Sequence, residues 1–220
     1  MRIDLRHHIR VAIDGPDAAG KTTLGDELAA LIQATGRPVI RASVDGFHRP
    51  RVARLTRGTE SPEGYYRDSF DYPALHEVLL TPLGPGGHRR YRRAVFDHPT
   101  DSPLPYATEY APHDAVLLFD GVFLLRPELI DAWDFRIFVT VPFEETVRRA
   151  VLRDRDLFGS EAIVRQRYAE RYLPGQRIYL EEVRPESLAD VMVDNADPQA
   201  PQLRWASAAD HRRRGEKASR

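Results

Sequence analysis

The chain has 220 residues, 42% of them hydrophobic and 30% charged, which suits one globular domain with at most a small appended lobe. Its net charge of −1 at pH 7 gives no overall field that would attract nucleic acid or an anionic membrane, so a nucleic-acid partner is not expected. The absence of cysteine excludes a disulfide framework and a thiolate metal site.

A phosphate-binding loop is predicted near the start of the chain. Its motif, G-x-x-x-x-G-K-[ST], is matched at every defined position, by Gly15, Gly20, Lys21 and Thr22. An apolar, β-branched run over residues 9–13 precedes the loop and suits a buried strand. Apolar residues then recur at helical spacing over residues 24–32, until Gly36 supplies a stop signal. A strand before the loop and a helix after it are the context that the motif requires.

The residue types in this loop have a chemical reason. Glycines let the backbone wrap around a phosphate, its N–H groups point inward, and the helix dipole adds positive potential. Lys21 would reach the β- and γ-phosphates, and the Thr22 hydroxyl would hold Mg²⁺. Lysine occurs only at positions 21 and 217, although Lys and Arg together number 32. The residues expected to bind the nucleotide are Gly15, Asp17, Ala18, Ala19, Gly20, Lys21, Thr22 and Thr23. The alternative is a glycine-rich turn without a ligand.

A second strand is predicted over residues 38–43, and Asp45 follows its end. Open α/β sheets bind ligands beyond the carboxyl ends of their strands, so Asp45 is a candidate functional carboxylate; the alternative is a simple Asp-Gly turn. Residues 49–72 form too long a segment for a plain connection, which favours a functional lid or a disordered loop. The aromatic residues in this segment argue against disorder.

Three shorter segments precede the next strand. A short helix is expected over residues 73–80. Residues 88–96 and 104–110 suggest two extended pieces of a hairpin-like excursion. His98 lies between two aspartates in the connection, which could indicate a metal cluster, but an exposed turn is the preferred interpretation.

A third buried strand is predicted over residues 115–119 and is closed by Asp120. A run of aliphatic residues ended by an acid has the form of a Walker B segment, whose carboxylate binds Mg²⁺ directly or through water; the alternative is another turn residue. The apolar run over residues 115–125 is too short and too polar to span a bilayer, and residues 1–10 lack the apolar region of a signal peptide. We therefore expect a cytoplasmic protein without a membrane partner.

An arginine-dense helix is expected over residues 144–156. Two glutamates lie four residues before Arg148 and Arg149, in the pairs Glu144–Arg148 and Glu145–Arg149, which is the spacing of helical ion pairs. These ion pairs would engage Arg148 and, as a second candidate, Arg149. They would leave Arg153 and Arg155 free to contact a ligand.

Strands and helices alternate along the whole chain. The remaining predicted elements are a fourth strand over residues 135–141, helices over residues 160–173 and 174–182, and a fifth strand over residues 190–193. This pattern predicts a parallel sheet covered by helices on both faces. Residues 198–220, with a basic cluster at 211–214, suggest a flexible tail beyond a domain over residues 1–197.

In their order along the chain, several of these motifs resemble those of the uridine kinase-like P-loop kinases, a group that includes phosphoribulokinase. The motifs are the phosphate-binding loop, Asp45-Gly46-Phe47-His48, Phe70-Asp71-Tyr72-Pro73, Asp120-Gly121 and Arg153-Asp154. The resemblance covers residues 9 to about 195. It implies an α/β P-loop NTPase fold of three layers, α/β/α, with a five-stranded parallel sheet. It also implies a small substrate-binding insertion over about 46–112, between strands 2 and 3, and a helical lid over about 153–173.

The resemblance further implies a reaction, with ATP as phosphate donor, Mg²⁺ as metal and a sugar-type hydroxyl of a small molecule as acceptor. Asp45 would be the base beside the attacking hydroxyl, and Asp71 would bind ribose hydroxyls. Asp120 would assist Mg²⁺ together with Thr22, and Arg153 would lie in the lid over the phosphates. Lys21 and Arg153 would join Asp45 in catalysis. The residues expected to contact the acceptor are His48, Asp71, Tyr91 and Arg149.

The chain departs from the family pattern on the acceptor side. Uridine kinases carry a His five residues after the Tyr of their base-reading hairpin, whereas Tyr91 is followed by Phe96, with His98 two residues beyond. They also carry an Arg three residues before the R-D arginine, where this chain has Ala150, with Arg149 one position earlier. The acceptor therefore stays open between a nucleoside, a sugar phosphate and a vitamin precursor.

A nucleotide-binding switch or regulator that hydrolyses nucleotide slowly is the alternative from another class of protein. Guanine-nucleotide switches read their base with an N/T-K-x-D segment, and neither lysine of this chain stands in one. They also carry D-x-x-G after the third strand, where this chain has Asp120-Gly121-Val122-Phe123. These differences favour the kinase. The sequence leaves open whether the protein forms a homo-oligomer.

Overall fold

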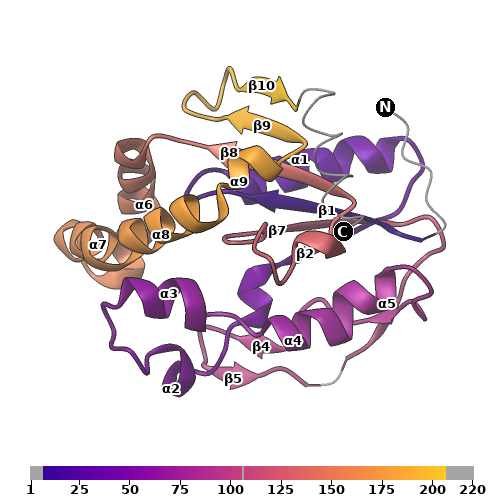
Figure 1. Ribbon diagram of the computed structural model, residues 1–220, viewed down its shortest axis with the longest axis horizontal. Helices are drawn as coiled ribbons and strands as arrows, with labels where there is room; N and C mark the ends of the chain where they lie inside the picture. Colours follow the sequence, from indigo (N-terminus) through magenta and orange to yellow (C-terminus); the bar gives the residue numbers. More distant parts are fainter. Residues whose placement is uncertain (1–6, 106, 207–220) are drawn as a thin grey trace.

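The computed structural model describes residues 7–105 and 107–206. Its centre is a six-stranded sheet in the order β10-β9-β8-β1-β7-β2 (Figure 1). The strands are β1 (Ile9–Asp14), β2 (Val39–Ser43), β7 (Val116–Gly121), β8 (Phe135–Thr140), β9 (Val191–Asp194) and β10 (Gln202–Trp205). The five strands expected from the sequence are all present, and the pairings among them are parallel.

The sixth strand, β10, corrects two predictions. It pairs antiparallel with β9, so the sheet has six strands and is mostly, not wholly, parallel. The strand also lies within residues 198–220, for which a flexible tail is predicted. Residues 202–205 of that segment instead form an edge strand of the sheet. The strand is four residues long and exposed, with Leu203 and Trp205 facing solvent, so its sequence has no buried apolar pattern to reveal it. The basic cluster at 211–214 lies outside the described residues.

The two faces of the sheet are covered by different parts of the chain, as the alternation of side chains along β1 shows. Ile9, Val11 and Ile13 point to the face covered by α1 (Lys21–Ala34), where Leu28 and other apolar residues of that helix pack against them. Ala12 points to the opposite face, where it joins a core built with the long segment between β2 and β7 and with α8 (Leu173–Val183). The predicted three-layer α/β/α architecture is confirmed.

The predicted insertion between the second and third core strands lies against one end and one face of the sheet, at the bottom of Figure 1. Its helical elements are η1 (Val44–Phe47), α2 (Arg51–Arg54), α3 (Pro62–Asp68), α4 (Tyr72–Leu75), the π-helical turn η2 (His76–Leu80) and α5 (Thr81–Leu83). Its short strands are β3 (Arg90–Tyr91), β4 (Phe96–Asp97), β5 (Ser102–Pro103) and β6 (Glu109–Tyr110), in which β3 pairs with β6 and β4 with β5. The helix after Pro73 and the hairpin-like excursion are thus present, and the segment 49–72 contains two short helices.

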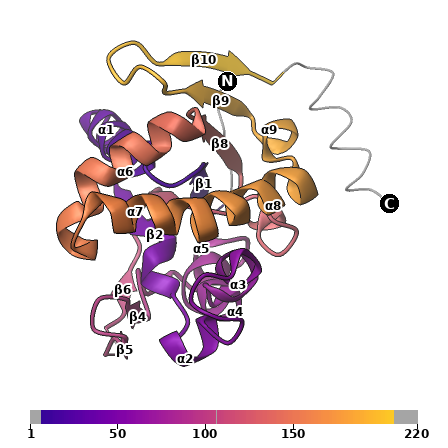
Figure 2. The same cartoon turned by 90° about the vertical axis from the view of Figure 1, so that its left-hand side faces the viewer.

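The helices after β8 run along one side of the molecule and include residues 153–173, for which a lid is predicted (Figure 2). They are α6 (Phe143–Phe158), α7 (Glu161–Arg167), the π-helical turn η4 (Tyr168–Tyr172), α8 and α9 (Pro185–Leu188); η3 (Ile130–Ala132) precedes β8. Gly175 lets α8 approach α3 closely, because a Cβ there would lie 2.7 Å from Tyr65 Cδ1. The rings of Tyr65 and Tyr172 meet edge to face, with centroids 5.0 Å apart. Lid and insertion are therefore packed against each other.

None of the described helices is long and apolar enough to cross a bilayer. The cytoplasmic location expected from the sequence stays a prediction.

Candidate functional site

The sheet register brings the predicted site residues to one edge. Asp120 in β7 lies beside Ile13 of β1 on one side and Ser43 of β2 on the other. These three strands run in the same direction, so the loop after β1 and Asp45 after β2 both emerge at the edge that carries Asp120. The topology thus assembles the motifs at residues 15–22, 45 and 120 at one edge of the sheet.

The loop between β1 and α1 has the backbone conformation of an anion site. Gly15 has φ 150° and Gly20 has φ 91°, and Ala18 is also left-handed, at φ 55°. A Cβ on Gly15 would lie 2.4 Å from the carbonyl oxygen of Val139, so only glycine fits beside β8. Among the residues that the structure describes, none accepts a hydrogen bond from the backbone N–H groups of Asp17, Ala18, Gly20 and Lys21. These donors suit the oxygens of a bound phosphate.

Lys21 is buried at the start of α1, with its ammonium Nζ donating to the carbonyl oxygen of Pro16 at 2.7 Å. Burial lowers the pKa of Lys21, and the negative charges around it oppose that effect, Asp17 foremost and then Asp14, Asp45 and Asp120. The cation therefore lies at the centre of the acidic groups that the strand ends bring together. A buried lysine beside free amide donors is suited to neutralise polyphosphate charge.

Thr22 and Asp120, the predicted metal pair, are in contact. Thr22 Oγ1 donates to Asp120 Oδ2 at 2.8 Å, and Asp120 is buried whereas Thr22 is exposed. The other carboxylate oxygen of Asp120 pairs with Arg41 Nη2 at 3.0 Å. Mg²⁺ takes few protein ligands and keeps waters and phosphate oxygens, so this small set of oxygen donors fits it. The described residues include no group of three or more His, Cys, Asp or Glu that could hold a metal, so Thr22 and Asp120 remain the candidates. Arg41 was not foreseen from the sequence.

Asp45 is the second residue of the 3₁₀ turn η1, and its backbone N–H donates to Ser43 Oγ, in the residue that caps the turn, at 3.3 Å. Its carboxylate is exposed, and no described residue donates a hydrogen bond to it. Nevertheless, the pKa of Asp45 is raised, first because surrounding protein desolvates the carboxylate and second because the charge of Asp17 is near. An accessible, unpartnered carboxylate that is also desolvated on its protein side is equipped to accept a proton from a ligand.

Two histidines lie next to Asp45, and sequence analysis predicted a role for only one of them. The ring of His48, whose Nδ1 bonds to the Asp45 carbonyl oxygen at 3.0 Å, stacks on that of His98 with centroids 4.2 Å apart. Arg54 Nη1 donates to His98 Nε2 at 2.7 Å, and Arg54 Nη2 pairs with Asp101. Burial lowers the pKa of both histidines to about 4, so both rings are neutral at pH 7. His98 is in an exposed turn, as expected, but its ring faces the site.

The other two predicted acceptor residues of the insertion differ in position. Asp71 lies close to the Asp45 turn, because its backbone N–H donates to Phe47 O at 2.8 Å; its side chain caps α4 through the N–H of Ala74 at 2.9 Å. Tyr91 is buried, and its hydroxyl donates to Glu109 Oε2 at 3.1 Å. Asp71 therefore lies near the candidate base, whereas the Tyr91 hydroxyl is engaged within the hairpin of the insertion.

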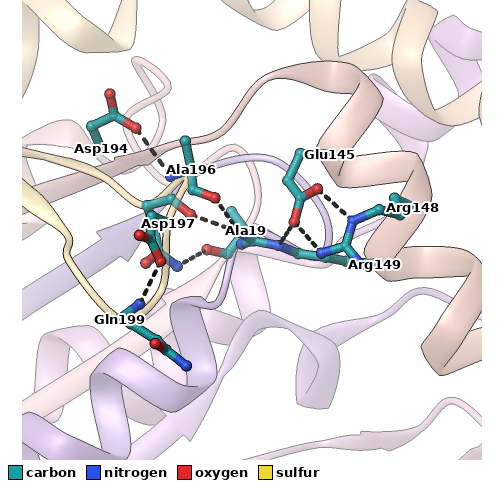
Figure 3. Close-up of polar contacts among 9 residues, drawn as sticks. Ala19, Glu145, Arg148, Arg149, Asp194, Ala196, Asp197 and Gln199 are labelled. Atoms are coloured by element: carbon teal, nitrogen blue, oxygen red, sulfur yellow. Dashed lines mark hydrogen bonds and ion pairs between the residues drawn. The ribbon is translucent and has the colours of Figure 1, made fainter.

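Arg149 lies on the nucleotide side of the site (Figure 3). Its guanidinium donates to the carbonyl oxygens of Asn195 and Ala196 at 2.7 and 3.1 Å, and to Glu145 at 2.6 Å. The Asn195 amide in turn donates to Ala19 O, in the phosphate-binding loop, at 2.7 Å. Arg149 thus holds the segment after β9 against this loop, and these contacts do not connect it with Asp45 or His48. Its predicted contact with the acceptor stays a prediction.

Of the two ion pairs expected in the arginine-dense helix, Glu145–Arg149 is confirmed and Glu144–Arg148 is wrong. Arg148 pairs with Glu145, three residues earlier, and not with Glu144, because Glu145 accepts from both Arg148 and Arg149 (Figure 3).

Arg153 and Arg155, expected to be free, also have partners. Arg153 forms two hydrogen bonds with the adjacent Asp154, at 2.6 and 2.8 Å, and Arg155 lies 3.5 Å from Asp156. Side chains this long can fold back onto the next residue, a geometry that helical i,i+4 spacing does not anticipate. The guanidinium of Arg153 is nonetheless exposed, and its pKa is raised first by Asp154 and to a lesser extent by Asp17 of the phosphate-binding loop.

Asp14, the last residue of β1, is a fully buried carboxylate that sequence analysis did not single out. One oxygen accepts from the Gly15 N–H at 2.7 Å, and the other accepts from the Tyr179 hydroxyl and from the Leu125 N–H at 3.3 Å. Burial nevertheless raises the pKa of Asp14 to about 6. Asp14 therefore joins the start of the phosphate-binding loop to α8 and to the turn after β7.

Solved structures with the same architecture are known. A candidate uridine kinase from Bacillus stearothermophilus is 24% identical with a TM-score of 0.66, over 86% of this chain and 90% of that one. A candidate fructose transport system kinase from a Silicibacter species is 26% identical with a TM-score of 0.69, over 82% and 88%. Phosphoribulokinase from Rhodobacter spheroides is 16% identical with a TM-score of 0.58, over 86% and 71%. No protein-family model matches the chain.

Proposed function

Because the chain has the fold of the uridine kinase-like P-loop kinases, we propose that it is an ATP-dependent kinase of a small molecule, which transfers the γ-phosphate to a hydroxyl group. The observation that carries this proposal is the position of Asp45. Its carboxylate is exposed, unpartnered among the described residues, and close enough to Lys21 for their charges to interact. A carboxylate facing the phosphate-binding loop in this way is suited to receive an acceptor hydroxyl.

The phosphate side of the reaction would be served by the loop and its neighbours. The free N–H groups of Asp17, Ala18, Gly20 and Lys21 would bind phosphate oxygens. The Lys21 ammonium would exchange the carbonyl of Pro16 for a phosphate. Mg²⁺ would be held by Thr22 and Asp120 and would neutralise charge on the transferred group. Arg153 is exposed in the lid and could turn from Asp154 toward the phosphates. Positioning and cations supply most of the catalysis in phosphoryl transfer.

The acceptor side would be served by Asp45 and its surroundings. Asp45 would orient the hydroxyl and accept its proton, and the raised pKa of its carboxylate makes it a better base than an ordinary aspartate. The neutral rings of His48 and His98 lie next to Asp45, tilted by 43° to each other, and Asp71 lies close by. These groups suit a nucleoside or a related sugar-containing molecule. The similar structures of a candidate uridine kinase and a candidate fructose transport system kinase agree with that class.

ADP release in the presence of ATP, Mg²⁺ and a panel of nucleosides, sugars, sugar phosphates and vitamin precursors tests the proposal. We expect ADP release to require one class of acceptor. Asp45→Asn should lower kcat by about 10²–10⁴ without changing nucleotide affinity, because it removes general-base catalysis. Asp114→Asn is the matched control, since Asp114 is an exposed aspartate at the start of β7, at the other end of the sheet.

Two results would contradict this proposal. Full turnover in Asp45→Asn would remove Asp45 from the reaction. ADP release that no acceptor accelerates would favour a nucleotide-hydrolysing regulator on the same fold, the alternative from another class of protein.

A further inference from the structure

The side chain of Asp17 occupies an unusual position for an acid. It belongs to the loop whose N–H groups are suited to phosphate, yet its own carboxylate carries negative charge. The Tyr65 hydroxyl, from α3 of the insertion, donates to Asp17 Oδ2 at 2.5 Å, and Gln176 Nε2 of α8 donates to the Tyr65 oxygen at 3.3 Å. Tyr65 is buried, whereas Asp17 is partly exposed. One carboxylate oxygen is therefore fixed by the insertion, and the side chain still meets solvent.

The charge of Asp17 acts on the groups of the proposed reaction. Among the acidic groups that act on the pKa of Lys21 and of Asp45, Asp17 has the largest effect on each. It also acts on His48 of the insertion and on Arg153 of the lid. Asp17 thus acts electrostatically on groups of both the phosphate site and the acceptor side, and the Tyr65 hydroxyl ties its carboxylate to the insertion.

Electrostatics indicates what such a carboxylate binds. The negative charge of the Asp17 carboxylate would repel the phosphates of a bound nucleotide and so oppose nucleotide binding. Phosphate recognition therefore does not explain why an aspartate stands at this position. An ionised carboxylate is an acceptor of hydrogen bonds only, and the Oδ1 atom of Asp17 accepts none from the described residues. The ligand that suits it is therefore a neutral donor, such as a second hydroxyl on the molecule whose first hydroxyl meets Asp45.

We propose that Asp17 is a specificity-determining residue: its free carboxylate oxygen binds a non-reacting hydroxyl of the acceptor, and the Tyr65 hydroxyl orients it. The acceptor is accordingly a diol or polyol, such as a furanose ring or an open-chain sugar, and not a simple alcohol. This inference rests on the proposed kinase function and makes its acceptor class more specific.

The test pairs variants with acceptors that lack one hydroxyl. Wild-type, Asp17→Ala, Asp17→Asn and Tyr65→Phe proteins are assayed with uridine, 2′-deoxyuridine and 3′-deoxyuridine, and with D-fructose and its monodeoxy analogues. We expect wild-type kcat/KM to fall about 10- to 100-fold for one particular deoxy analogue, the range for losing a hydrogen bond to a charged group. Asp17→Ala should lose a similar factor with the complete acceptor and little with that analogue. Tyr65→Phe should reduce the same discrimination to a smaller extent.

The outcomes separate this inference from the proposed function. Wild-type protein that phosphorylates no acceptor of the panel refutes both. A wild-type kinase whose Asp17→Ala variant loses the same factor with complete and deoxy acceptors refutes the role of Asp17 alone. Weakened binding of a non-hydrolysable ATP analogue in Asp17→Ala would likewise refute it, because the carboxylate would then serve the nucleotide loop.

Discussion

Replacement of Asp14 by Asn should change how the stability of the protein depends on pH. The carboxyl of Asp14 has a pKa of 3.8 in an exposed reference state and about 6 in the folded protein, because it is fully buried. A raised folded pKa means that the native state holds its proton more tightly than the unfolded chain. The stability contributed by the protonated form is therefore present below about pH 4 and is lost as pH rises through 6.

The size of this effect follows from the two pKa values. The full difference corresponds to about 3 kcal/mol, at 1.36 kcal/mol for each pKa unit. Between pH 5 and pH 7.5 the part of it that is lost is about 1.5 kcal/mol, since the unfolded carboxyl is already ionised at pH 5. Asn at position 14 does not titrate, so Asp14→Asn should gain about 1.5 kcal/mol relative to the wild type over this interval.

Urea unfolding followed by tryptophan fluorescence measures this difference, because Trp133 is buried and stacked on Phe119. The free energy of unfolding is obtained at pH 5 and at pH 7.5 for wild type, Asp14→Asn and the exposed control Asp114→Asn. The histidines at 48 and 98, whose lowered pKa acts in the opposite sense, are present in all three proteins and cancel in the comparison. A difference between wild type and Asp14→Asn that stays constant with pH would refute the assignment of a raised pKa to Asp14.

Two further substitutions test the nucleotide loop. Arg149→Met should raise the KM for ATP about 10-fold and leave that for the acceptor unchanged, because it removes two hydrogen bonds that hold the segment after β9 against Ala19. Arg148→Met is its control, and a change confined to the acceptor KM would restore the sequence-based role of Arg149. Gly15→Ala should abolish ATP binding in calorimetry, since the added Cβ would lie 2.4 Å from Val139 O. Gly36→Ala is its control, because Gly36 also has a positive φ but no atom lies within 4 Å of an added Cβ. An equal loss of ATP affinity in both variants would show that the contact with Val139 is not the reason for the effect at Gly15.

The parts of the site that could be predicted from sequence are those with a local signature. The phosphate-binding loop is specified within ten residues, and Asp45 and Asp120 each end an apolar strand, so strand order alone brings them to one edge. The five core strands were predictable because each contains a short apolar run, although Arg10, Arg41 and Arg136 interrupt three of them.

The contacts that could not be predicted join distant segments. Asp14 meets Tyr179 across 165 residues, and Asp120 pairs with Arg41, which the sequence presents as an ordinary residue of β2. His98 reaches His48 only because the insertion folds back on itself. The helices α2 and α3 are four and seven residues long, too short to be stable alone, and depend on tertiary packing.

The contact between lid and insertion has a consequence for how substrates enter and leave. Tyr172 packs on Tyr65, and Arg171 donates to the carbonyl oxygens of Gly58 and Thr59, so the predicted lid is held against the insertion that would receive the acceptor. An outward movement of the lid must either break its contacts with the insertion or carry the insertion with it. In the proposed kinase, movements that admit nucleotide and movements that admit acceptor would therefore be coupled through these contacts.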